Sequence, residues 1–159
     1  MTDNELEFEL AMRSVVTIKA PPERVWNYLD RPRDWKPSIV SLELIAGTAG
    51  AEGETLRVGQ RPAAETVHVI MRTLRLAVPS WRVQTLATEG SRAVEGFLLY
   101  SLRAVATGTE LSCEFVAHCR VPPAVAAADR DFARQVGEAT LSTLDADHLA
   151  LKQLVEQEG

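Results

Sequence analysis

Three polar side chains lie in segments whose apolar residues alternate, and they are the first candidates for chemistry. Tyr100 belongs to an apolar series at every second position of residues 92–105, so the pattern predicts a strand with Tyr100 on its buried face. His68 and Arg72 share one face of residues 66–78. If that face is buried, the imidazole and the guanidinium could bind a carboxylate or an enolate oxygen.

Each of these three residues also has a purely structural explanation. The hydroxyl of a core tyrosine commonly reaches a nearby hydrogen-bond partner, which would account for Tyr100 without any ligand. The alternation in 66–78 is ambiguous, because its odd-numbered and its even-numbered positions both carry apolar residues. If the odd-numbered face points inward, His68 and Arg72 are solvated surface residues. Both orientations remain open from the sequence.

Two tryptophans are aromatic candidates for a ligand-binding surface. Trp81 shares one face of residues 81–87 with small and β-branched residues. It could stack on a ligand ring, although packing in the core explains it as well. Trp35 lies two residues before Pro37, where it either anchors a short helix or reaches the mouth of a cavity.

The remaining candidates are residues on the predicted inward faces of two strands and one helix. They are Leu98, Leu102, Cys113, Phe115, Phe132 and Val136. Small residues in the same series, such as Gly96 and Ala117, leave volume that large residues would fill. This favours a cavity, but close packing against a helix explains it about equally well.

Metal, disulfide and cofactor chemistry is not predicted. The three histidines, His68, His118 and His148, lie on separate segments without metal-ligand spacing, and His148 is expected on a helix surface. Cys113 and Cys119 lie on one predicted strand, roughly 20 Å apart at about 3.4 Å per residue. A disulfide needs Cα atoms within about 7 Å, so we expect two buried free thiols. No phosphate-binding or dinucleotide fingerprint is present, so no cofactor is expected.

The composition of the chain limits the classes of partner that it can bind. The chain has 159 residues and a formal net charge of -5, which argues against nucleic acid as the main partner. No run approaches the roughly 18 apolar residues of a membrane span, and the acidic first ten residues do not resemble a secretory signal. Together with the free thiols, these features predict a cytoplasmic protein.

The elements that must position the candidates follow from periodicity and prolines. Residues 8–18 predict a strand, and Pro21 and Pro22 then suit the first turn of a short amphipathic helix. Pro32 ends that helix, and a second short helix or turn follows it. Further strands are predicted at 39–46, 54–60, 66–78, 81–87, 92–105 and 110–121, and a long helix at 129–156. The sequence therefore predicts one α+β domain over residues 1–159.

This order of elements resembles the START-like, or SRPBCC, helix-grip superfamily, and in particular its polyketide cyclase/dehydrase-like members. The resemblance rests on I-K-A-P-P-E-R-V-W-N-Y-L-D at 18–30 with W-K-P at 35–37, on Y-S-L at 100–102 with G-T-E-L at 108–111, and on L-x-x-L-V-E at 151–156. It implies a curved antiparallel sheet of about seven strands wrapped around a long C-terminal helix, with two short helices after the first strand. It also implies a hydrophobic cavity between the sheet and that helix, but it assigns no catalytic residue.

The leading functional hypothesis is therefore the binding of a hydrophobic, ring-containing small molecule in that cavity. Lipid binding falls under the same hypothesis. One alternative is an enzyme similar to polyketide cyclases and dehydrases, in which Arg72, His68 or Tyr100 polarises a carbonyl or moves a proton. A second alternative is a protein-interaction module. Phe97 and Leu99 interrupt the polar face of their strand and could form the contact of a homodimer.

Overall fold

The computed structural model describes residues 6–61, 66–90, 93–122 and 132–158. Its strands form one seven-stranded antiparallel sheet in the order β1-β7-β6-β5-β4-β3-β2. The strands are β1 (Leu6–Ile18), β2 (Ile39–Ala46), β3 (Thr55–Gln60), β4 (Val67–Ala77), β5 (Trp81–Thr88), β6 (Val94–Val105) and β7 (Gly108–Val121). The helices are α1 (Pro22–Leu29), the short 3-10 helix η1 (Pro32–Asp34) and α3 (Phe132–Gln157). The predicted α+β helix-grip architecture is confirmed.

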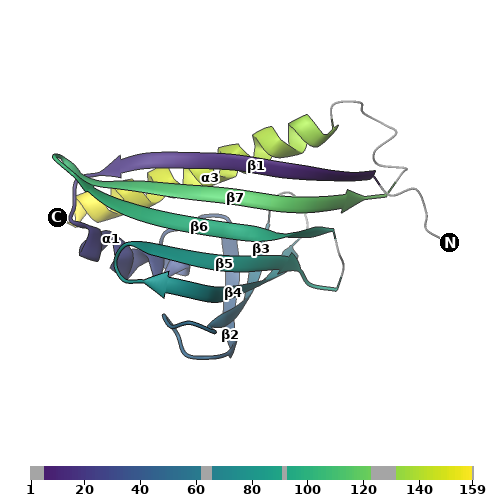
Figure 1. Ribbon diagram of the computed structural model, residues 1–159, viewed down its shortest axis with the longest axis horizontal. Coiled ribbons are helices and arrows are strands. Elements are labelled where there is room, and N and C mark those ends of the chain that lie inside the picture. Colours follow the sequence, from purple (N-terminus) through teal and green to yellow (C-terminus); the bar gives the residue numbers. More distant parts are fainter. Residues whose placement is uncertain (1–5, 62–65, 91–92, 123–131, 159) are drawn as a thin grey trace.

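The sheet curves strongly between its two edges. Figure 1 shows the long strands β1 and β7 lying side by side, while β2 and β3 at the other edge are steeply inclined to them. Helix α3 extends along β1 and packs mainly against it. The short helix α1 lies at one end of the sheet. This arrangement encloses a core between the concave face of the sheet and the helices.

Helix α1 follows from its sequence. Pro22 occupies the first turn, where its missing N–H breaks no helical hydrogen bond, and Glu23 complements the helix dipole there. The helix buries Val25, Trp26, Tyr28 and Leu29. Asp30 caps its C-terminus, and Pro32 opens η1 directly afterwards. The chain therefore turns twice within a short distance and covers one end of the sheet.

The turn between β6 and β7 fits closely against the connection from β1 to α1. Gly108 has φ +143°, and a side chain there would collide with the carbonyl oxygen of Ile18. The Thr109 hydroxyl is buried and donates a hydrogen bond of 2.6 Å to the Ala20 carbonyl. The start of α1 is thus tied to the end of the longest hairpin.

Burial decides which strand faces point inward. Leu98, Tyr100 and Leu102 of β6 are buried, as are Cys113 and Phe115 of β7, so the predicted inward faces of these two strands are confirmed. Both cysteines are buried and free, as predicted.

The orientations considered for β4 and β5 need correction. Met71 and Thr73 are buried and Arg72 is exposed. Up to the register shift after Thr73, the odd-numbered face of β4 therefore points inward, and the interpretation that turns His68 and Arg72 inward is wrong. In β5 the buried side chains are Arg82, Gln84 and Leu86. Trp81 is 38% exposed on the opposite face, so it lies outside the core. Alternation alone could not decide these faces, because both faces of β4 carry apolar residues.

No helix among the described residues is both long enough and apolar enough to span a membrane.

Candidate functional site

A small cavity lies between the concave face of the sheet and the segment that joins α1 to β2. Its volume is about 20 Å³, which is room for roughly one water molecule. Its apolar walls include Leu29, Ile39, Leu56, Val58 and Met71. Its polar lining residues are Lys36, Glu54, Gln60, Arg82, Gln84 and Tyr100. The sequence predicted a cavity against the C-terminal helix, whereas no described residue of α3 lines this one.

Lys36 is the most unusual of the polar lining residues. It is only 9% exposed, and its Nζ lies 5.1 Å from the ring centre of Trp35 and 5.6 Å from that of Tyr100. Among the described residues, no hydrogen bond or ion pair to Nζ is found beyond these two cation–π contacts. Burial lowers the pKa of Lys36, while Cys113 and Asp147 oppose that shift. The site thus holds a buried amine without a bonded carboxylate.

Tyr100 and Cys113 stand opposite each other on β6 and β7. The Tyr100 hydroxyl is buried and has no hydrogen-bond partner among the described residues, apart from the thiol of Cys113, which is at best a weak one. Burial, and then Cys113, raise the pKa of Tyr100 well above its usual value. Burial likewise raises the pKa of the Cys113 thiol to about 11, although Lys36 opposes this. Both groups are therefore protonated at neutral pH, and the hydroxyl is available as a hydrogen-bond donor.

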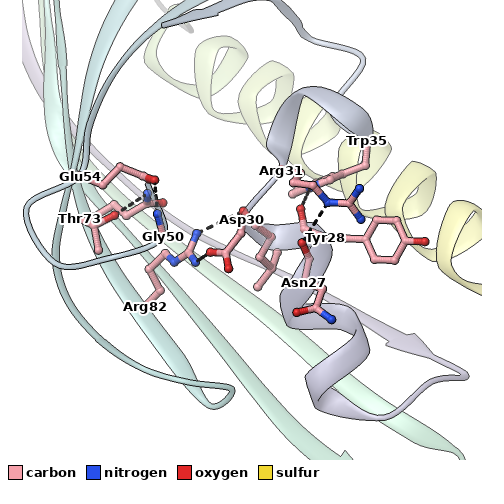
Figure 2. Close-up of polar contacts among 11 residues, drawn as sticks. Asn27, Tyr28, Asp30, Arg31, Trp35, Gly50, Glu54, Thr73 and Arg82 are labelled. Carbon is pink, nitrogen blue, oxygen red and sulfur yellow. Dashed lines mark hydrogen bonds and ion pairs between the residues drawn. The ribbon is translucent and has the colours of Figure 1, made fainter. Parts of the chain in front are cut away.

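Arg82 connects the cavity wall to α1. Figure 2 shows its guanidinium extending from β5 toward Asp30 at the end of α1. Nη2 forms an ion pair with the Asp30 carboxylate, Nη1 donates to the Leu29 carbonyl at 3.2 Å, and Cζ lies 4.8 Å from the Trp26 ring centre. Only Nε has no partner among the described residues. The contacts of Arg82 are mostly made within the protein, so its main role is to hold α1 against the sheet.

Glu54 also has its hydrogen-bond partners within the protein. Its carboxylate accepts a hydrogen bond of 2.5 Å from the backbone N–H of Gly50, and its backbone bonds with Thr73 of β4 (Figure 2). The amide of Gln84 donates to the Thr73 hydroxyl at 3.2 Å. Lys36 and Tyr100 are therefore the buried polar lining residues whose end groups remain without an oxygen or nitrogen hydrogen-bond partner in the described part of the chain.

A further polar group, the imidazole of His148, packs against the rings of Tyr100 and Trp35. His148 of α3 is 1% exposed, and its ring centre lies 5.9 Å from that of Tyr100 and 6.2 Å from that of Trp35. Its Nδ1 is 2.8 Å from the Ser14 hydroxyl, which donates at 2.6 Å to Asp145. Burial, and then the positive charge of Lys36, lower the pKa of His148 to about 4. His148 is therefore neutral at pH 7, and the expectation that it lies on a helix surface is wrong.

Asp147, the residue beside His148 in the sequence, faces the same region. It is 5% exposed and accepts a hydrogen bond of 2.9 Å from the Ser38 hydroxyl. Burial raises the pKa of Asp147, whereas Lys36 and the Ser38 hydrogen bond act to lower it. The hydrogen bond links α3 to the segment that carries Trp35 and Lys36.

The structure brings together only some of the residues that the sequence singled out. Tyr100 and Trp35 line the cavity, and the Trp35 indole N–H donates to the Tyr28 carbonyl at 2.7 Å. Leu98, Leu102, Cys113 and Phe115 belong to the buried core, and Val136 packs against it. His68, Arg72 and Trp81 do not line the cavity. The side chain of Phe132 lies outside the described residues.

Sequence reasoning missed the polar residues that matter most here. Ser14 carried a usable signal, because it interrupts the apolar series of the predicted strand 8–18. Lys36 carried none, since one lysine between a tryptophan and a proline looks like an ordinary surface residue. His148 and Arg82 are buried only because of partners distant in the sequence. Among the described residues, no group of three potential ligands could hold a metal ion.

Comparison with solved structures shows the same fold at low sequence identity. A conserved protein from Geobacillus kaustophilus is 14% identical with a TM-score of 0.73, over 93% of this chain and 96% of that one. A protein from Thermus thermophilus is 13% identical with a TM-score of 0.71, over 96% of this chain and 99% of that one. Ara h 8.0201 is 14% identical with a TM-score of 0.66, over 94% and 99%. At these identities the likeness concerns the fold alone.

The family follows from the sequence itself. No curated protein matches the chain closely enough to assign a function. Residues 9–156, however, match the family described as polyketide cyclase / dehydrase and lipid transport. That match covers nearly the whole chain and agrees with the seven-stranded curved sheet and the long C-terminal helix. The chain belongs to the polyketide cyclase/dehydrase and lipid transport family of START-like proteins.

Proposed function

We propose that this protein binds a hydrophobic, ring-containing small molecule in the cavity, and that Lys36 anchors an acidic or carbonyl oxygen of that molecule. The observation that supports this is the buried Lys36 amine, which lies over the faces of Trp35 and Tyr100 and has no hydrogen bond or ion pair among the described residues. Asp147 is close enough to act on the charge of Lys36, but a buried ammonium without a directly bonded counter-charge is still costly. An anionic or carbonyl oxygen in the cavity would offset that cost, and the protonated Tyr100 hydroxyl would supply a second donor.

The walls suit an apolar ring. Leu29, Leu56, Val58 and Met71 surround the space, and burial of apolar surface contributes about 25 cal/mol per Å². A volume of about 20 Å³ does not admit a ring, so binding must displace wall side chains. Met71 is unbranched and can adopt other rotamers readily. Ligand entry therefore requires movement between the α1–β2 segment and the sheet.

The test is a comparison of three small aromatic probes, naphthalene, 1-naphthoate and 1-methoxynaphthalene, by calorimetry with the wild-type protein and with Lys36→Met. Wild type should prefer 1-naphthoate to naphthalene by about tenfold or more, because a charge-assisted hydrogen bond contributes about 1.5–3 kcal/mol. Lys36→Met should abolish that preference and retain naphthalene binding. Lys19→Met, at an exposed position, is the matched control. An unchanged preference in Lys36→Met would contradict the anchoring role.

A second candidate function is catalysis of the cyclase or dehydrase type, which the convergence of three proton-transfer groups favours. Lys36 Nζ lies over the Tyr100 ring, and the Tyr100 ring contacts that of His148. Lys36 would polarise a carbonyl oxygen, and a neighbouring group would move a proton. The test is deuterium exchange at the α-carbon of 2-tetralone, followed by NMR. Exchange accelerated by wild type and lost in Lys36→Met would favour an enzyme; exchange at the buffer rate would favour a binding protein.

The protein-interaction alternative rests on the outer face of the sheet. Phe97 of β6 and Val116 of β7 are paired in register and are 50% and 49% exposed. A mass measurement by light scattering tests a homodimer, since a monomer mass at every concentration would remove it.

A further inference from the structure

The hydrogen bonds around Ser14 determine which nitrogen of His148 carries the proton. A serine hydroxyl has one proton to donate, and that of Ser14 is directed to Asp145 Oδ1 at 2.6 Å. The 2.8 Å contact between Ser14 Oγ and His148 Nδ1 must then use a proton on the imidazole. Neutral imidazole carries only one N–H, so Nε2 presents a bare lone pair.

That lone pair has no donor. Nε2 of His148 is fully buried and unpartnered among the described residues, and the hydroxyl of Tyr100 beside it likewise has no oxygen or nitrogen partner there. Buried polar atoms in folded proteins nearly always have partners, and leaving one unpaired destabilises the fold. Tyr100 and Trp35 line the cavity and contact the His148 ring, whereas His148 itself does not line it. A bound group that displaces one of these two side chains and donates a hydrogen bond would satisfy Nε2.

We propose that His148 Nε2 accepts a hydrogen bond from a hydroxyl group of the ligand, and that Asp145 and Ser14 position it for this role by holding the ring in the Nδ1–H tautomer. The inference rests on the proposed binding function and narrows the ligand class to ring compounds with a phenol-type or enol-type hydroxyl. Such an oxygen both donates and accepts. It can donate to His148 while it accepts from Tyr100 or from Lys36, which lies over the Tyr100 ring.

Groups from three sides orient His148; burial and Lys36 keep it neutral, whereas the charge of Asp145 favours the protonated imidazole. Asp145 lies on its own helix and acts through Ser14 of β1. Lys36, on the segment before β2, disfavours the protonated imidazole by its positive charge. Tyr100 of β6 contacts the ring edge to face, and Trp35 contacts it at a tilt of 31°. The residues that face the imidazole therefore fix its plane and leave Nε2 directed away from the Ser14 side.

The first experiment measures the tautomer by nitrogen-15 NMR at pH 7. The chain has three histidines, and the spectrum of His148→Gln identifies the signals of His148. Wild type should show the Nδ1–H form. Asp145→Asn should switch it to Nε2–H, because an amide can donate to Ser14, which then donates to Nδ1. Glu138→Gln, an exposed acid-to-amide change on the same helix, should leave the tautomer unchanged. An Nε2–H form in wild type would overturn the proposal without any variant.

The second experiment measures ligand discrimination. Wild type should bind 1-naphthol about tenfold more tightly than 1-methoxynaphthalene, which has the same ring but cannot donate. Asp145→Asn should lose this preference while still binding naphthalene, and Ser14→Ala is the second variant should Asp145→Asn fail to fold. Equal binding of the two probes by wild type, with naphthalene bound, would overturn the role of His148 alone. If wild type binds none of 1-naphthol, 1-methoxynaphthalene and naphthalene, the proposed binding function is overturned as well.

Discussion

At the scale of single residues, the site is defined by ionisable groups whose pKa values are shifted by burial. Burial lowers the pKa of Lys36, and the two aromatic faces near its amine and the charge of Asp147 do not offset that effect. His148 becomes neutral for the same reason, and Tyr100 keeps its proton. In an ordinary core, buried polar groups such as these have hydrogen-bond partners. In the described part of the chain, Lys36 Nζ, the Tyr100 hydroxyl and His148 Nε2 lack an oxygen or nitrogen hydrogen-bond partner, and this distinguishes the region.

The buried His148 should make stability depend on pH. Its pKa is about 4 in the folded protein, against 6.5 in the unfolded chain, so below pH 6.5 the unfolded chain binds the proton first. The contribution of neutral His148 to the free energy of unfolding is therefore fully present above pH 6.5. It falls as the pH drops toward 4, by up to roughly 3 kcal/mol. Urea unfolding at pH 4.5 and pH 7 should show a smaller pH-dependent loss for His148→Gln than for wild type. Equal losses would show that other groups dominate.

The two thiols should be inert in the folded protein. Cys113 is fully buried and burial raises its pKa to about 11, and burial also raises the pKa of Cys119. Because the thiolate is the reactive form, we expect almost no modification by iodoacetamide at pH 8 without denaturant and two modifications in urea. Mass spectrometry counts them. Rapid labelling of Cys113 in the native protein would indicate that the core around Cys113 opens readily.

At the scale of elements, the position of α1 decides whether a site exists. The helix and η1 supply Leu29 and Pro32 to the cavity wall, and Arg82 fastens the end of α1 to β5 through Asp30 and the Leu29 carbonyl. The Gly108 turn secures its beginning. The cavity is thus enclosed by a short segment held at both ends by contacts with distant strands.

Removal of the Arg82 contacts should destabilise the fold. Arg82→Met leaves the Asp30 carboxylate and the Leu29 carbonyl without their donor. Breaking a buried pair costs about 3–5 kcal/mol, and since the Asp30 side chain is 33% exposed we expect a loss of about 2–3 kcal/mol in urea unfolding. The control is Arg57→Met, whose ion pair with Glu89 is exposed and should contribute about 0–1 kcal/mol. Similar losses in both variants would contradict the anchoring role of Arg82.

At the scale of the whole molecule, one curved sheet separates two surfaces with different properties. The concave face carries the cavity and the buried polar groups, and the outer face carries the exposed pair Phe97 and Val116. Because alternate residues of a strand point to opposite faces, changes on one face need not disturb the other. Ligand binding and any self-association are therefore separable.

The substitution Phe97→Asp tests that separation. Phe97 is half exposed, so we expect a stability change within about 1 kcal/mol and unchanged affinity for 1-naphthoate. If the wild-type protein is a homodimer through this patch, the variant should have a monomer mass in light scattering. A large loss of ligand affinity would show that the two faces are coupled.

The architecture was predictable from the sequence, because it depends on local and periodic signals. The paired prolines at 21 and 22 predicted the start of α1, and alternation predicted β1 and the inward faces of β6 and β7, each of which has one clearly apolar face. The inward position of Tyr100 and the free state of both cysteines followed from the same pattern.

The chemistry of the site, in contrast, depends on contacts between segments distant in the chain. The face of β4 that points inward depends on its neighbours, since both faces carry apolar residues. Arg82 is buried because Asp30 and the Leu29 carbonyl, more than fifty positions earlier in the chain, receive its donors. Ser14 meets Asp145 and His148 across more than 130 positions. A polar residue is stable in a core only when a partner meets it there, and periodicity contains no information about partners so distant.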